Sequence, residues 1–335
     1  MISRRAFTAG ALAALATASC STRRSPRQVV VYSSVDAPIL RSILEAFERE
    51  HAIRVLSAGD TEATKTTGLM QRALTDLGRV DVWWSNEAMA TLRLADQGAL
   101  APFAPSPSSA WTRADPSGLW HAFSPRFRCF VFNPRRAADP PRTLADLASP
   151  AWRERLGLAR PEFGTTRGLM GALLAAWGPD AFSHWAASLK HNRARLYDGN
   201  SSVVRACALG EIDAGLTDTD DVFAAQAQGW PVELAFEPLD PSASPPSLGA
   251  LELPNTIALL RDAPHPDEAR AFIDFALSEH VDRLLMQSES RNLPTRPALR
   301  TAYTHPIPAD IMPVDLAHAA RLAPDAVEAF SRAQG

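Results

Sequence analysis

The chain has 335 residues, of which 46% are hydrophobic and 21% are charged, and this length corresponds to about two domains with enough apolar material for a large core. The formal net charge is only −3, and no basic block recurs after the first 30 residues. These values exclude nucleic acid as a partner, because phosphate backbones are bound by concentrated positive charge.

The N-terminus predicts export from the cytoplasm. Arg4 and Arg5 precede a short apolar stretch at residues 9–18, an order typical of a twin-arginine-like signal. The stretch is too short to span a bilayer permanently. Cleavage after Ala18 and cleavage before Cys20 both stay open, and the second would leave a lipidated Cys20 as the protein's only membrane contact. We therefore interpret residues 1–27 as export signal and tether, and expect a periplasmic or cell-surface location.

After this segment, strand patterns alternate with helical patterns. Strands are predicted at residues 29–32, 53–56, 80–84, 127–132, 156–159, 214–216 and 251–260, and helices at 39–47, 67–77, 88–97, 144–147, 164–177, 201–209, 221–228, 267–277 and 280–287. This alternation is typical of α/β folds with parallel sheets. Ligands bind beyond the carboxyl ends of such strands, which for the first strand means around Ser33, Ser34 and Asp36. Asp36 also lies just ahead of Pro38, as a helix N-cap would.

The chain is long enough for two α/β lobes around a cleft, where small ligands are commonly buried. We predict that the strands near Cys129 and Leu259 cross between the lobes. The first lobe would comprise residues 28–127 plus 250–296, and the second residues 128–249 plus 297–335. Cys129 and Cys207 lie in strand-like and helix-like runs and are expected to be buried small hydrophobes, with a disulfide between them left open.

An ordered series of motifs resembles the type II periplasmic binding proteins of ABC importers, specifically the ferric-ion-binding subgroup. The motifs lie at residues 29–33, 81–87, 126–133, 144–152, 214–221, 254–256 and 263–266. The resemblance implies a two-lobed venus-flytrap fold in which each lobe is a mixed, mostly parallel sheet flanked by helices. It also implies a monomer that captures its ligand between the lobes, delivers it to a permease driven by a separate ATPase, and has no enzymatic activity.

The resemblance also implies a partial set of iron ligands. Such proteins hold Fe(III) with a glutamate after the second strand, adjacent tyrosines in the second lobe, in some members a histidine near the first strand and, in many members, an arginine-held anion. Glu87 falls on the glutamate position, and Arg126 and Arg128 fall on the arginine positions. Asp220 and Asp221 stand where the paired tyrosines usually occur. The most diagnostic part of the iron set is therefore replaced.

The residues themselves favour a hard cation. Asp218, Asp220 and Asp221 lie within four residues, between a predicted strand and a predicted helix, and carboxylate oxygens suit hard metal ions. The alternative is a helix N-cap followed by an acidic first turn. We take Glu87 as the fourth candidate metal ligand, although it could equally be a first-turn acid of the next helix. Carboxylates from two lobes would repel by about 1 to 4 kcal/mol at contact, so closure of the cleft would depend on a bound cation.

A second group of residues favours an anion. Arg126 and Arg128 are two residues apart on a strand and so share one face, while Thr165, Thr166 and Asn200 lie at predicted helix starts, where backbone N–H groups point outward. Strand-edge charge and ordinary helix capping are the alternative explanations. The remaining candidate ligand-binding residues are Ser33, Ser34, Lys65, Asn86 and Asn255.

Together these patterns predict an extracytoplasmic solute-binding component of an ABC transporter. Its ligand would be ferric iron or another hard metal ion with a carbonate-like anion, and no other cofactor is expected. A phosphonate, a polyamine or another small organic solute stays open, as does a ligand-sensing module for a signalling partner. The sequence lacks nucleophile-elbow, dinucleotide-binding and phosphate-loop motifs, which argues against an enzyme.

Overall fold

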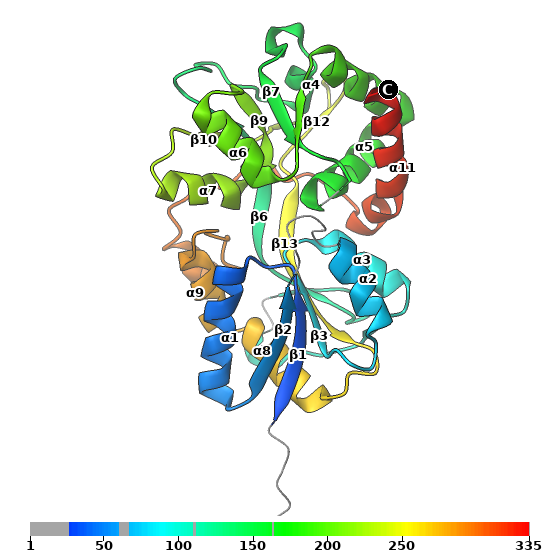
Figure 1. Ribbon diagram of the computed structural model, residues 1–335, viewed down its shortest axis with the longest axis vertical. Coiled ribbons are helices and arrows are strands. Elements are labelled where there is room, and N and C mark those ends of the chain that lie inside the picture. Colours follow the sequence, from blue (N-terminus) through cyan, green and yellow to red (C-terminus); the bar gives the residue numbers. More distant parts are fainter. Residues whose placement is uncertain (1–26, 60–66, 110–111, 163, 335) are drawn as a thin grey trace, which may run out of the picture.

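Two lobes joined by a pair of long strands make up the described part of the chain (Figure 1). The computed structural model describes residues 27–59, 67–109, 112–162 and 164–334. Within them the strand order is β2-β1-β3-β13-β6-β9-β7-β8, so one continuous path of strands runs through both lobes. Helices flank the sheet of each lobe. The predicted two-lobed α/β fold is confirmed.

The lobe that contains the N-terminal strand forms around a continuous apolar run in that strand. Val29 and Val31 are fully buried and pack with Ile43 and Phe47 of the first helix and with Phe272. The first strand pairs in parallel with the second and third. The elements of this lobe are β1 (Gln28–Ser33), α1 (Ala37–His51), β2 (Arg54–Gly59), α2 (Thr67–Thr75), β3 (Val82–Ser85), α3 (Ala88–Asp96), β4 (Leu100–Ala101), η1 (Pro107–Ser109), β5 (Arg113–Ala114), β13 (Glu252–Leu260), α8 (Pro266–Ala276) and α9 (Glu279–Gln287).

The other lobe is centred on a parallel trio of strands, β8, β7 and β9, with α5 and α11 packed together on one side. A Cβ atom at Gly171 of α5 would overlap the backbone of Ala319 in α11, so this close helix contact requires glycine. The elements are β6 (His121–Phe132), α4 (Leu144–Leu147), η2 (Pro150–Trp152), β7 (Leu156–Ala159), α5 (Gly164–His191), β8 (Arg195–Tyr197), α6 (Asn200–Leu209), β9 (Ala214–Asp218), α7 (Thr219–Ala227), β10 (Glu233–Ala235), β11 (Leu239–Asp240), β12 (Ser247–Leu248) and α11 (Leu316–Gln334), while α10 (Pro297–Arg300) lies on the segment that leads to α11.

Strand β6 belongs to both lobes. Its first half, up to Phe127, pairs with β13, and its second half, from Arg128, pairs with β9. The two strands run side by side at the waist of the molecule, as the sequence predicts for the strands around Cys129 and Leu259 (Figure 1). The change of partner places Arg126 and Arg128 on either side of the point where the lobes meet.

Several details differ from the sequence-based expectations. The helix predicted to end at Trp177 continues to His191 across a kink at Gly178, whose φ of 74° is left-handed. The short strands β8 and β10 and the helix α11 were not predicted. Cys129 and Cys207 are buried and unpaired. The exact residue boundaries of the lobes stay a prediction.

Some predictions fall on residues that the structure does not describe. The export signal, the lipid anchor at Cys20 and the candidate ligand Lys65 all lie outside the described ranges. Among the helices of the described ranges, none has the length and apolar character needed to cross a membrane.

Candidate functional site

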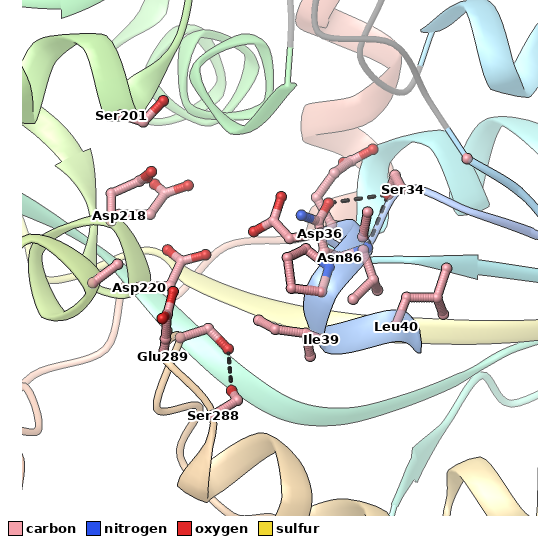
Figure 2. Close-up of a pocket in the computed structure, with 18 of the residues that line it drawn as sticks. Ser34, Asp36, Ile39, Leu40, Asn86, Ser201, Asp218, Asp220, Ser288 and Glu289 are labelled. Atoms are coloured by element: carbon pink, nitrogen blue, oxygen red, sulfur yellow. Dashed lines mark hydrogen bonds between the residues drawn. The ribbon is translucent and has the colours of Figure 1, made fainter. Parts of the chain in front are cut away.

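A cavity of about 960 Å³ opens between the two lobes. It is lined by the turns that follow β1 and β3, the N-termini of α5 and α6, the turn between β9 and α7, and the segment after α9. These turns lie at the carboxyl ends of parallel strands from both lobes, where α/β sheets place their ligands. Figure 2 shows the acidic side chains that face this space.

Three carboxylates gather at the end of β9. Asp218, Asp220 and Asp221 each offer an oxygen atom, and these atoms lie within 4.8 Å of one another. Asp218 occupies the N-cap position of α7, but its side chain makes no capping hydrogen bond within the described chain. Its carboxylate instead accepts hydrogen bonds from the Thr165 hydroxyl at 2.7 Å and from the Asn200 amide at 2.9 Å. Helix capping alone therefore does not explain why the three carboxylates lie together. The sequence predicts such a grouping of carboxylates at this strand end.

The two predicted arginines are ion-paired with this cluster. Arg128 Nη1 lies 2.7 Å from Asp218 Oδ1, and Arg126 Nε lies 2.9 Å from Asp220 Oδ2. Arg126 lines the cavity and also donates to the backbone carbonyl of Asn86 in the other lobe. Arg128 is not among the described lining residues, because its guanidinium is enclosed by Asp218, Thr165 and Thr166. Arg128 thus faces the cluster, and its role in holding an anion stays a prediction.

The cluster holds more carboxyl groups than guanidiniums. Among the described residues, three carboxylates share the guanidiniums of Arg126 and Arg128. Burial, opposed in part by Arg126, raises the pKa of Asp220 to about 6. Burial and the neighbouring charge of Asp220 raise the pKa of Asp221 well above its ordinary value. Asp220 Oδ1 has no hydrogen-bond partner among the described residues. A cation placed here would supply the missing charge.

Glu87 faces the same cavity from the other lobe. Its carboxylate caps α3, accepting from the backbone N–H of Met89 at 2.6 Å and of Ala90 at 3.1 Å. Burial outweighs these two bonds and raises the pKa of Glu87. The helix-start role considered for Glu87 is thus present in the structure, and its role as a metal ligand stays a prediction.

Most of the other predicted binding residues line the cavity. Ser34 and Asn86 face it from the first lobe, with the Ser34 hydroxyl donating to Asn86 Oδ1 at 3.0 Å. Thr165, Thr166 and Asn200 face it from the second, at the N-termini of α5 and α6.

Two predicted binding residues, Ser33 and Asn255, are not among the described residues that line the cavity. Their roles as ligands stay predictions. Ser33 Oγ accepts a hydrogen bond from the Val35 N–H, and Asn255 bridges the Trp84 indole and the Ser124 carbonyl. Both side chains are buried in the joint around the crossing strands, where their polar atoms are satisfied by the protein itself.

Of the acidic residues that line the cavity without having been predicted as ligands, Asp36 and Glu289 concern the region of the cluster. Asp36 makes no capping bond to α1 within the described residues, and its charge helps to raise the pKa of Asp220 and Asp221 across the cavity. Its position at the end of β1 was a usable signal, but the N-cap interpretation concealed it. Glu289 follows α9 and lines the same cavity (Figure 2). No local pattern marks Glu289, because only the folded chain brings that segment to the cleft.

Comparisons with known proteins agree with this architecture. The model of the family described as bacterial extracellular solute-binding protein matches residues 28–288. The chain is 27% identical over 290 residues to the major ferric iron-binding protein of Neisseria meningitidis serogroup B, covering 82% of each chain. It is also 27% identical over 195 residues to the Fe(3+)-binding periplasmic protein of Serratia marcescens, covering 56% of each chain, so it spans just over half the length of that relative.

A similarity to solved structures extends over nearly the whole chain. Iron-bound HitA from Pseudomonas aeruginosa superimposes with a TM-score of 0.78 at 24% identity, covering 92% of this chain and 99% of the other. At this level of identity the likeness establishes the fold, including the two lobes and the cleft between them.

Proposed function

This chain belongs to the bacterial extracellular solute-binding protein family, and we propose that it is the exported binding component of an ABC importer whose solute is ferric iron, or another hard metal ion, held together with a small anion. The observation that carries the proposal is the cluster of Asp218, Asp220 and Asp221 in the cleft. These carboxylates are drawn together and partly buried without enough positive charge to balance them. The iron-binding names of the relatives from Neisseria and Serratia support the same solute.

The available ligand atoms suit a hard cation. Asp220 and Asp221 offer oxygens from one lobe, while Asp36 offers a carboxylate from the other. Hard cations prefer such oxygen ligands. Ligands from opposite lobes would also link binding to closure, because the cation would relieve the repulsion between Asp36 and the cluster.

Phenolate oxygens would have no part in this site. The sequence contains three tyrosines, Tyr32, Tyr197 and Tyr303, and none is among the described lining residues. The tyrosine pair that the family resemblance implies is therefore replaced by carboxylates. A small anion would complete the coordination, and the N-termini of α5 and α6, with Thr166 and Asn200, are the groups that would hold it.

Family membership supports the rest of the assignment. Proteins of this kind capture a solute outside the cytoplasm and present it to a membrane permease with a separate ATPase, and we propose the same partners and a periplasmic location here. The chain would act by binding and release, without catalysing a reaction.

One observation favours a second candidate, an organic cation such as a polyamine. The cavity volume of about 960 Å³ greatly exceeds the space that a single metal ion needs, and the lining is rich in acids. A polyamine would neutralise the same carboxylates without coordination chemistry.

Thermal unfolding with defined ligands tests these alternatives. We expect Fe(III) with carbonate or citrate to raise the unfolding midpoint of the wild type, because a ligand that binds the folded state stabilises it. The Asp220→Asn/Asp221→Asn double variant should lose that shift. Asp198→Asn is the matched control, since Asp198 lines the same cavity but is 94% exposed and paired with Arg160. A midpoint raised by spermidine or a phosphonate and unmoved by Fe(III) would refute the metal assignment.

A further inference from the structure

We infer that Arg126 is a built-in competitor of the cargo: its guanidinium pairs with the carboxylate cluster before a cation binds, and so makes the binding free energy of cations less favourable in proportion to their charge. This inference rests on the proposed function and assigns a role within the same site. It differs from the role that the family resemblance implies for Arg126, which is to hold an anion. The two roles predict opposite effects when the charge is removed.

The position of Arg126 supports this role. Its side chain is 5% exposed and lines the cavity beside the cluster. Nε lies 2.9 Å from Asp220 Oδ2, and Nη2 lies 3.5 Å from Asp218 Oδ2. The guanidinium thus contacts two of the three carboxylates that a metal ion would use. A cation bound there would meet a fixed positive charge at close range.

Arg126 is also held so that it cannot easily leave. It projects from β6 near the point where this strand changes partner, and it donates to the backbone carbonyl of Asn86 in the opposite lobe. Burial alone would lower the pKa of Arg126, but the charges of Asp220 and Asp218 outweigh burial and raise it. The group therefore stays charged over the whole physiological pH range.

Coulomb's law gives the inference a quantitative form. The repulsion between Arg126 and a bound ion is proportional to the charge of that ion. Removing the guanidinium should therefore strengthen binding of a trivalent ion more than binding of a divalent one, with the logarithms of the two affinity gains in a ratio of about 3 to 2. An arginine that holds the anion would instead cause a loss of affinity when removed.

The test is to measure affinities of Arg126→Gln for Fe(III), delivered from its citrate complex, and for Mn(II), added as the chloride. We expect the variant to bind Mn(II) at least about tenfold more tightly than the wild type does. Its affinity for Fe(III) should increase by a larger factor. Arg126→Lys, which keeps the charge, should stay close to the wild type. Arg160→Gln is a matched control, because this lining arginine is 48% exposed and solvent screens its charge.

Weaker binding of both ions by Arg126→Gln would overturn the inference and favour the anion role, while leaving the proposed function intact. If the wild type bound neither ion, the proposed function itself would fail. Removing a buried guanidinium can also unfold a protein, and Arg126→Met then serves as the second variant. Folding of either variant only in the presence of Mn(II) would support the inference.

A measurement on the wild type does not depend on any variant folding. The Arg126 Nε–H resonance should shift on addition of diamagnetic Ga(III), because the bound ion competes with Arg126 for the Asp220 carboxylate and brings positive charge close to the Nε–H group. An unchanged resonance at saturating Ga(III) would contradict competition.

Discussion

The two ends of strand β9 carry buried aspartates in contrasting surroundings. Asp213 precedes the strand and pairs with Arg136 Nε at 2.5 Å and Arg155 Nε at 2.6 Å. Burial would raise the pKa of Asp213, but its hydrogen bonds to the two arginines outweigh burial and lower it. At the other end, where three carboxylates share Arg126 and Arg128, the pKa of Asp220 rises to about 6.

The difference teaches that the balance of charges, and not the residue type, separates a structural joint from a binding site. One acid with two arginines is satisfied and needs no ligand. An excess of acids over arginines is unsatisfied, and clusters of perturbed carboxylates in a cleft are typical of functional sites. The following predictions test this contrast, starting with the largest expected effect.

The largest effect should come from neutralising the unsatisfied end. Asp220→Asn/Asp221→Asn should weaken Fe(III) binding by about 100-fold or more, since two of the proposed carboxylate ligands are lost. Competition titration against citrate measures the change. Asp213→Asn is the control at the opposite end of the same strand, and an equal loss of affinity there would break the comparison.

The next largest effect should be the pH dependence of the stability that Asp220 contributes. Because the folded-state pKa of Asp220, about 6, lies above its ordinary value of 3.8, its contribution to stability is present below about pH 4 and is lost as the pH rises through 6. Relative to Asp220→Asn, the wild type should lose on the order of 2 kcal/mol over this range. Urea unfolding of both proteins without metal at pH 4.5 and 7.5 measures the difference. A constant difference would contradict the raised pKa.

At the other end of β9, the stability contribution of Asp213 should change with pH in the opposite direction. Asp213→Asn should reduce stability at neutral pH by about 1 kcal/mol, a modest value because Arg136 and Arg155 are 51% and 40% exposed and solvent screens both pairs. Since the pKa of Asp213 is lowered, this contribution is present above its ordinary value and is lost as the pH falls. Urea unfolding at pH 7 and at pH 3 checks the trend, and a destabilisation that grew on acidification would refute it.

The smallest effect concerns Asp36, across the cleft from the cluster. Asp36→Asn should weaken Fe(III) binding by about threefold, because an exposed carboxylate contributes through partly screened charge. The free energy of unfolding of Asp36→Asn should equal that of the wild type, since the Asp36 side chain makes no capping bond among the described residues. Thr143→Ala is the contrasting variant, because Thr143 caps α4 through a complete capping box and should lose about 1 kcal/mol. A loss of stability in Asp36→Asn equal to that of Thr143→Ala would indicate a cap after all.

Local patterns in the sequence were sufficient for most of the elements. The β-branched run of β1, the amphipathic spacing of α1 and the aspartates at the end of β9 are all local patterns, and the structure has each of them where predicted. The elements that were missed include the strands β8 and β10, the two-residue strands β4, β5, β11 and β12, and the helices α10 and α11. Strands β8 and β10, for example, have three residues each, too few for a periodic pattern to emerge.

The candidate site was only partly predictable for the same reason. Asp218, Asp220 and Asp221 are adjacent in the chain, so their clustering was visible in advance. Ser33 lies at the end of β1 and Asn255 lies within β13, yet both side chains are used inside the protein. The direction in which such a side chain points depends on the neighbouring strands, and no local sequence pattern identifies those neighbours.

The sequence by itself determined the family, the two-lobed α/β architecture and a carboxylate group at one strand end, because these follow from the order and periodicity of residues close in the chain. The tertiary structure alone decided the charge balance of the cleft. It set Arg126 and Arg128 against the cluster, turned the carboxylate of Glu87 to its own helix, and brought Asp36 across the cavity. Electrostatic interactions depend on distance in space and on burial, and both are fixed only when segments far apart in the chain come together.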